Sequence, residues 1–395
     1  MHPPIHRALA ALALLGLTAS LVCALGAPAA AQPSRPPTPG SWALDAKPDV
    51  DLEAQMFAGY RFEDTEAEDF NEFALTRAEL GAWLRFNPHL GGELRVEAIR
   101  SAGPQSLIGV DGDSLVLRAK RAWAYARVKA DPVIIDLRAG LIPDPWIDTL
   151  EMSYDLRGIS PTAGELTTFF DTSDLGASAI VDLKQGLARL QVAATNGEGR
   201  NQAEQNTGKN TTAVLSVQPL RLTLGGEPAA LTLLAFYRDG SVGVGKARSN
   251  RVGGGVTFTS VYGWAGAEYM RADGVLGRDQ QGEALAAWFN APVWANWVGL
   301  VGRFDQFSLN SEADDAARTI ISGGIYSDLV YPGRPPDPTR FRVYLIGQRE
   351  DAGADAGPVP GAPEIASATR VLLLLDIGAR ATISNSGPRS GRGAP

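Results

Sequence analysis

The sequence predicts an all-β fold: a transmembrane antiparallel β-barrel of about 16 strands, with long extracellular loops and short periplasmic turns. Three observations lead to it. Strand-like segments between residues 52 and 382 are joined by connections that alternate between long and short. Many of these segments alternate apolar and polar residues, as a barrel wall does. Past the N-terminus, no apolar stretch approaches the roughly 20 residues that a transmembrane helix needs.

The alternation of connection lengths is the most specific of the three, because a β-sandwich has no reason to sort its turns into two alternating classes. The short connections carry Gly, Pro, Asn and Asp, which reverse a chain quickly. We expect short turns at 87–89, 130–132, 185–186, 225–228, 260–261, 291–294 and 330–338. We expect long connections at 63–70, 102–112, 143–173, 196–209, 239–247, 272–280, 308–317 and 349–368.

The N-terminus predicts export. Residues 1–31 combine a weakly basic start, an apolar run and a small-residue end, which is the pattern of a secretory signal peptide, and an uncleaved anchor is the alternative. Residues 32–50 form a Pro-rich periplasmic leader, 51–383 the barrel and 384–395 a flexible tail. The chain's one cysteine, Cys23, lies in the predicted signal, so the mature chain has no disulfide.

Charge and chemistry exclude several function classes. The net charge of -8 and the pI near 5.1 argue against a nucleic-acid partner. Two of the three histidines belong to the predicted signal and the third, His89, lies in a predicted turn. A Ser-His-Asp site or a zinc site therefore lacks its parts. We expect no catalytic residues, no metal site and no cofactor.

The predicted strands divide into an apolar face and a charged face. In 76–86, for example, Leu80 and Leu84 share one face while Arg77 and Glu79 share the other. A barrel turns the apolar face to lipid and the polar face to the lumen, whereas a soluble sandwich would reverse the assignment, so alternation alone leaves both open. For a barrel, the predicted pore-lining residues are Arg77, Glu79, Arg85, Glu93, Arg95, Glu97, Asp136, Arg138, Arg342, Asp376 and Arg380.

Aromatic residues favour the barrel. They gather at strand ends next to long loops, as Phe236 and Tyr237 do, and next to short turns, as Phe289 and Trp294 do. Aromatic rings prefer both edges of a bilayer.

The third long connection, 143–173, contains enough apolar residues to pack rather than extend into solvent. A long loop of this kind usually has a function or its own fold. In a barrel it can turn inward and narrow the channel, and an external lid or adhesin-like loop is the alternative. The predicted constriction residues are Asp144, Trp146, Asp148, Glu151, Asp155 and Arg157.

Two stretches resemble a known family. Phe73–Gly81 followed by Gly92–Glu97, and Lys120–Arg127 followed by Leu137–Pro143, are similar to the early hairpins of the phosphate-selective porin (O and P type) family. The similarity covers about residues 50–180. It implies a sixteen-stranded, trimeric porin that passes small anions or other hydrophilic solutes. The chain departs from the family in having few lysines and in ending with a Gly, Ser, Arg and Pro tail.

The resulting hypothesis is an outer-membrane porin, a passive diffusion channel for small hydrophilic solutes with a preference for anions. Its expected partners are outer-membrane lipid and lipopolysaccharide, the permeating solutes and two further copies of the chain in a homotrimer. An exported structural or ligand-binding β-protein, of the adhesin or sugar-binding type, is the alternative.

Overall fold

The computed structural model describes residues 49–65, 69–100, 115–183, 186–200, 202–294, 297–330, 339–357 and 367–383. The predicted signal, most of the leader, the tail, the loop 102–112 and most of the turn 330–338 lie outside the described residues. Within them, no helix is long and apolar enough to cross a membrane.

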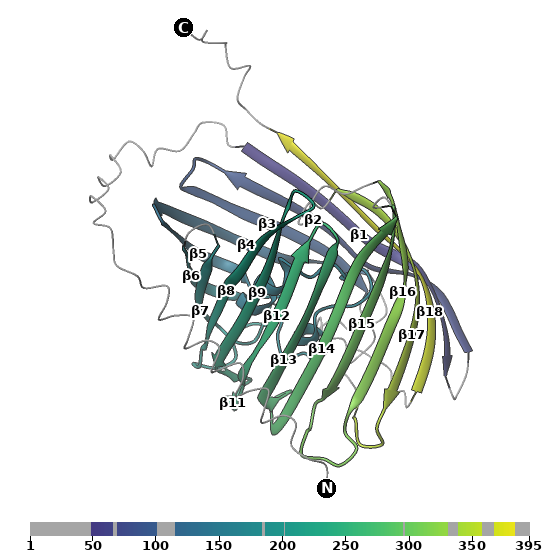
Figure 1. Cartoon of the computed structure of the whole chain (residues 1–395). Coiled ribbons are helices and arrows are strands. Elements are labelled where there is room, and N and C mark those ends of the chain that lie inside the picture. Colours follow the sequence, from purple (N-terminus) through teal and green to yellow (C-terminus); the bar gives the residue numbers. More distant parts are fainter. Residues whose placement is uncertain are drawn as a thin grey trace. The chain divides into compact units, whose positions relative to one another are not determined.

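Sixteen antiparallel strands close into one barrel. Each strand pairs with its neighbours, and the first strand, β1, pairs with the last, β18, so the sheet has no free edge. Figure 1 shows β1 in purple beside β18 in yellow. The closed barrel confirms the predicted fold class and removes the sandwich alternative.

The strands of the barrel are β1 (Asp49–Thr65), β2 (Asp69–Arg85), β3 (Leu90–Arg100), β4 (Leu115–Ala130), β5 (Val133–Pro143), β6 (Ser173–Leu183), β7 (Ala188–Thr195), β8 (Asn210–Leu224), β9 (Glu227–Asp239), β12 (Asn250–Ser260), β13 (Gly263–Val275), β14 (Arg278–Trp294), β15 (Val298–Ser308), β16 (Arg318–Val330), β17 (Arg340–Ala352) and β18 (Ser367–Ile383). A separate small hairpin, β10 (Ser241–Val242) with β11 (Ala247–Arg248), and two short helices, α2 (Pro145–Glu151) and α3 (Ala163–Leu166), lie in connections.

Two of the predicted long connections are wrong. β13 and β14 are joined by Leu276 and Gly277 alone, both with positive φ, which is the backbone of a tight two-residue hairpin. β1 and β2 likewise extend to Thr65 and Asp69. The residues at this end of the hairpin are charged and therefore resemble a loop in the sequence. Arg61 nevertheless pairs with Glu72 across the hairpin, 2.7 Å apart, and the strand pairing continues past them.

The barrel faces follow the predicted period of two. Leu80, Leu94 and Leu137 are half or more exposed on the outside. Their neighbours on the opposite face point inward. Phe236, which the sequence places in an aromatic belt, is an exception: it is buried inside the barrel, against Trp146 and Phe170.

Candidate functional site

The interior of the barrel is occupied by the connection between β5 and β6, residues 144–172, here called the inward loop. Its sequence contains its own helix signals. Asp144 caps α2, because its side chain accepts from the backbone N–H groups of Trp146 and Ile147 at 3.0 and 3.3 Å, and Pro145 opens the helix. Thr162 and Glu165 form a capping box at α3. The loop is therefore locally ordered.

One side of the inward loop is apolar and packs on the barrel wall. Trp146 is fully buried, and its ring lies 4.3 Å from that of Phe236 on β9. Tyr154 meets Trp288 of β14 edge-on at 5.3 Å. Around these rings lies the main core of the molecule, formed by inward side chains of β8, β9 and β13–β18. We call this part of the interior the apolar half.

A buried carboxylate ties the loop to the apolar half. The Trp146 Nε1–H donates to Glu268 Oε2 on β13 at 3.1 Å, and the backbone N–H of Ala163 donates to Glu268 Oε1 at 3.1 Å. Both oxygens of one wall residue thus hold two separate parts of the loop. Arg238 on β9 adds an ion pair to Asp144.

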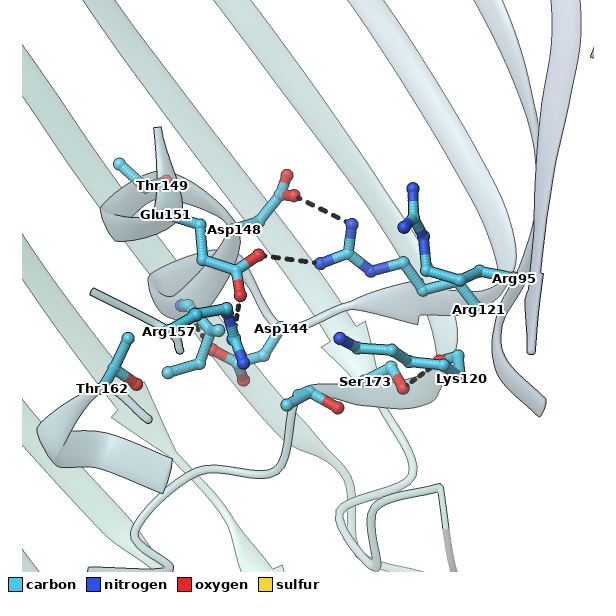
Figure 2. A network of polar contacts seen from close by, with 12 residues as sticks. Arg95, Lys120, Arg121, Asp144, Asp148, Thr149, Glu151, Arg157, Thr162 and Ser173 are labelled. Atoms are coloured by element: carbon cyan, nitrogen blue, oxygen red, sulfur yellow. Dashed lines mark hydrogen bonds and ion pairs between the residues drawn. The ribbon is translucent and has the colours of Figure 1, made fainter. Parts of the chain in front are cut away.

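The other side of the inward loop is charged and faces β4, β5 and β17. Asp148 accepts from Arg138 at 3.1 Å and Glu151 from Arg121 at 3.1 Å. Asp155 pairs with Arg342 at 2.8 Å and with Arg340. Figure 2 shows Asp148 and Glu151 on their helix pointing at Arg121, with Arg157 beside Glu151. The loop therefore presents carboxylates to arginines on the facing barrel wall.

The loop carboxylates stay ionised in this setting. Burial by itself would raise the pKa of Asp148, but the guanidinium groups of Arg138 and Arg121 hold that pKa below its ordinary value of 3.8. For Asp155, burial is likewise outweighed by Arg340 and Arg342, so its pKa is lowered too. Both are anions at neutral pH.

Between the inward loop and the wall lies a cavity of about 590 Å³. Its charged lining is unbalanced, with ten basic and seven acidic side chains. The acidic ones are Asp51, Glu53, Glu79, Asp136, Asp148, Glu151 and Asp155, and the basic ones are Arg85, Arg95, Lys120, Arg121, Arg127, Arg138, Arg157, Arg189, Arg340 and Arg380. We call this part of the interior the charged half.

Arg95 is the centre of the wall cluster. Its guanidinium contacts Glu53 at 2.6 Å, Glu93 at 2.8 Å and Glu79 at 3.4 Å. Glu79 also accepts from Lys120 at 2.6 Å. Gly81 lies beside this cluster, where an added Cβ would come within 3.0 Å of the Arg95 guanidinium. The absence of a side chain at Gly81 leaves room for the Arg95 guanidinium.

The predicted pore-lining residues separate into two groups. Glu79, Arg85, Arg95, Asp136, Arg138 and Arg380 line the cavity. The other five also point inward but are covered by partners: Glu93 by Trp123, Glu97 by Arg118, Arg77 by Glu79, Arg342 by Asp328 and Asp376 by Arg340. Of the predicted constriction residues, Asp148, Glu151, Asp155 and Arg157 line the cavity, while Asp144 and Trp146 are buried on the apolar side of the loop.

The interior beyond the inward loop, toward the long connections, is packed with ion pairs. Glu97 is fully buried and lies 2.7 Å from Arg118, 2.8 Å from Arg200 and 3.7 Å from Arg77. Arg200 comes from the connection between β7 and β8 and also pairs with Asp171 of the inward loop at 3.3 Å. None of these side chains lines the cavity.

Five basic residues of the cavity are missing from the predicted set: Lys120, Arg121, Arg127, Arg189 and Arg340. Lys120 and Arg121 are adjacent in sequence, yet both are buried inside, because the ladder between β3 and β4 shifts register there. The sequence carries a signal for this shift. Its apolar residues occupy odd positions before the shift, at Leu115, Leu117 and Ala119, and even positions after it, at Ala122 and Ala124. They share one face of the strand only if the alternation changes phase at 120–121. The cavity aromatics Trp83, Trp123 and Tyr125 were also missed.

Comparisons with known proteins show the fold. No protein-family model and no curated protein sequence matches the chain. The structure is similar to that of OmpF from Salmonella typhi in complex with daunomycin, at 12% identity over 83% of this chain and 97% of that one, with a TM-score of 0.55. It is similar to an anion-selective porin from Comamonas acidovorans, at 12% identity over 84% and 100%, TM-score 0.52. It is also similar to the outer-membrane channel DcaP of Acinetobacter baumannii, at 12% identity over 85% and 98%, TM-score 0.52.

Proposed function

We propose that the protein is a passive diffusion channel of the outer membrane, with the charged half of its interior as the permeation path and a preference for small anions. The observation that carries this proposal is the inward loop, which fills the apolar half of a closed barrel and leaves one charged cavity beside it. Closed β-barrels and helices are the two structures that can span a bilayer, since both satisfy their backbone hydrogen bonds internally.

The anion preference follows from the charge of the lining. Ten of the charged side chains that line the cavity are basic and seven are acidic, while Glu93, Glu165 and Asp376 pair from behind with Arg95, Arg157 and Arg340. The basic surplus therefore lies at the surface of the path, where low-dielectric walls focus the field that a solute meets. The carboxylates of the inward loop stand opposite the wall arginines, so a solute passing between them meets a transverse field. The proposal assigns the inward loop as the constriction.

The similar structures support a channel, because an anion-selective porin and an outer-membrane channel are among them. Another is a trimer form of OmpT of Vibrio cholerae, at 16% identity and a TM-score of 0.52. We include a homotrimer in the proposal, together with contacts to outer-membrane lipid and lipopolysaccharide. The resemblance to phosphate-selective porins stays a prediction.

Conductance in a planar lipid bilayer tests the function. We expect stepwise conductance and, in a potassium chloride gradient, a reversal potential that indicates chloride preference. Arg95→Ala and Arg138→Ala should each move the reversal potential toward cations, because each removes a positive charge from the cavity lining. Arg349→Ala is the matched control, since Arg349 is an exposed arginine that does not line the cavity.

Three results would contradict the proposal. Absence of stepwise conductance from a protein that migrates as a heat-modifiable barrel would favour the alternative, an exported structural or ligand-binding protein. Unchanged reversal potentials in both arginine variants would reject the assigned path. A shift of equal size in Arg349→Ala would show that surface charge, rather than the cavity, sets the selectivity.

A further inference from the structure

Three aromatic side chains from two strands meet on the wall of the charged cavity. Trp83 comes from β2, and Trp123 and Tyr125 come from β4. The ring of Trp123 lies 5.4 Å from that of Trp83 and 6.1 Å from that of Tyr125. All three line the cavity. We call them the aromatic shelf.

The shelf is held rigidly from behind. Trp123 is buried between the other two rings, and its Nε1–H donates to Glu93 at 3.1 Å. Tyr125 lies over Gly91, where an added Cβ would come within 2.6 Å of the ring. Trp83 and Tyr125 are only partly buried. Trp123 thus fixes two rings that remain in part accessible to the cavity.

Arginines border the shelf on both sides along the strands. The cross-strand register pairs Arg85 with Gly91, Gly91 with Tyr125 and Tyr125 with Arg138, which defines one row. The next row, toward the inward loop, runs from Trp83 through Glu93 to Trp123. The row after that pairs Arg95 with Arg121. Trp83 and Trp123 therefore lie between two arginine rows, and Tyr125 lies within the first of them.

The arginines are also in direct contact with the rings. The Arg138 guanidinium lies 4.6 Å from the centre of the Trp123 ring, and that of Arg127 lies 5.2 Å from the centre of the Tyr125 ring. Both of these guanidinium groups already hold carboxylates of the protein, because Arg127 donates bidentately to Asp136 at 2.6 Å and Arg138 donates to Asp148 at 3.1 Å.

Arg85, in the row of Tyr125, has a half-exposed side chain and contacts Asp51 at 3.3 Å through Nη2. The rest of its guanidinium fork can make a bidentate contact with a carboxylate in the cavity.

This combination favours one kind of solute. A carboxylate matches the guanidinium fork of Arg85, and a flat apolar ring matches the partly exposed rings of Trp83 and Tyr125. The cavity volume of about 590 Å³ lies within the range of small-molecule sites, about 300–1,000 Å³. A neutral sugar would use the rings but make no charge-assisted contact with Arg85.

We propose that the aromatic shelf and its bordering arginines form a binding subsite for small aromatic carboxylates on the permeation path. The proposal rests on the proposed function and refines it by giving the solute class. A bound aromatic anion occupies the cavity for longer than chloride does, so it reduces the chloride current while it is bound.

The test is block of the potassium chloride current in a planar bilayer by benzoate or by acetate, two carboxylates of equal charge. In the wild-type protein, benzoate should reach half-block at a concentration roughly tenfold lower than acetate, the size expected from one ring stacking interaction. In Trp83→Leu and in Tyr125→Leu, which keep an apolar side chain, the ratio of the two half-blocking concentrations should fall toward one. Trp294→Leu is the matched control, because Trp294 is exposed and does not line the cavity, and it should keep the ratio.

Other probes distinguish the alternatives. Equal block by benzoate and acetate in a conducting, anion-preferring wild-type channel would overturn the subsite and leave the proposed function standing, whereas absence of conductance would overturn the function itself. Block by benzyl alcohol at the same concentrations as benzoate would overturn the role of the arginines. Glucose block at concentrations where benzoate has no effect would assign the shelf to sugars and contradict the proposal.

Discussion

The two halves of the barrel interior are built from the same strand pattern and yet differ in what most of their inward side chains contact. The charged half, over β1–β5 with side chains from β7, β17 and β18, presents arginines and carboxylates to a cavity. The apolar half presents side chains such as Met270, Trp288 and Val301, all buried against the inward loop. The inward loop is therefore held by an apolar, water-free surface, and this part of the barrel interior becomes hydrophobic core.

The largest expected effect comes from breaking the anchor of the loop in the apolar half. Trp146→Ala removes a fully buried ring and one of the two donors to Glu268, and we expect it to lower the free energy of unfolding by about 3–5 kcal/mol. The channel should also conduct more and with more noise, because the loop is less firmly held. Urea unfolding, followed by the loss of heat-modifiable migration, measures the stability.

Trp294→Ala is the control, because Trp294 is largely exposed. Its unfolding midpoint should stay close to wild type. Equal losses in the two variants would mean that the inward loop does not depend on its apolar contacts.

The next-largest effect is expected from removing one charge of the inward loop. Asp155→Asn weakens the pairs with Arg340 and Arg342, and we expect a loss of about 1–3 kcal/mol as buried donors lose their ionised partner. Its reversal potential should move toward anions, opposite in sign to Arg138→Ala. Asp351→Asn, at an exposed pair, should move it little. A shift of Asp155→Asn toward cations would contradict the assigned path.

A smaller effect is expected in the wall under the shelf. Gly91→Ala would bring a Cβ within 2.4 Å of the Leu84 carbonyl oxygen and 2.6 Å of the Tyr125 ring. We expect a loss of stability of about 1–3 kcal/mol from this overpacking. Gly323→Ala, where the Cβ would meet only a carbonyl oxygen at 3.8 Å, should be tolerated. Equal urea midpoints for the two variants would contradict the close fit of Tyr125.

The smallest effect is the pH dependence of selectivity. The pKa of Asp148 and that of Asp155 lie below 3.8, so both carboxylates stay ionised from pH 7 to pH 5. The stability from their ion pairs is present above their ordinary pKa and is lost as the pH falls through the lowered value. We therefore expect no change of reversal potential caused by these groups down to pH 5, and a shift toward anions below about pH 4. A shift centred between pH 5 and 6 would point to other groups.

Much of the architecture could be predicted from the sequence because it depends on local patterns. The inward loop begins after Pro143 and ends before Ser173, as its composition indicated, and β18 ends at Ile383 although a polar tail follows. β8 forms despite Pro219, with a register shift between Val217 and Leu220 that accommodates the missing N–H group.

The rest depends on contacts between distant segments. The sequence predicted a charged lumen. This prediction is wrong for the apolar half, where the inward side chains form a hydrophobic core with the inward loop. Segments 229–237 and 284–289 carry apolar residues on both faces, which is the signal of a strand between lipid and a core. The phase change at Lys120 and Arg121, and the pairing of Glu97 with Arg200, arise from ladder register and loop packing. The break in alternation at 120–121 indicates the phase change, whereas nothing in the alternation indicates the pairing of Glu97 with Arg200.

Cysteine accessibility tests the division of the interior most directly, because Cys23 is the chain's one cysteine and lies in the predicted signal. Gln55→Cys places a thiol on the cavity wall, and Ala286→Cys places one in the apolar half, at a fully buried position. We expect a charged thiol reagent to reduce the single-channel current of Gln55→Cys stepwise and to leave that of Ala286→Cys unchanged. Modification of Ala286→Cys at a similar rate, or none at Gln55→Cys, would contradict the account.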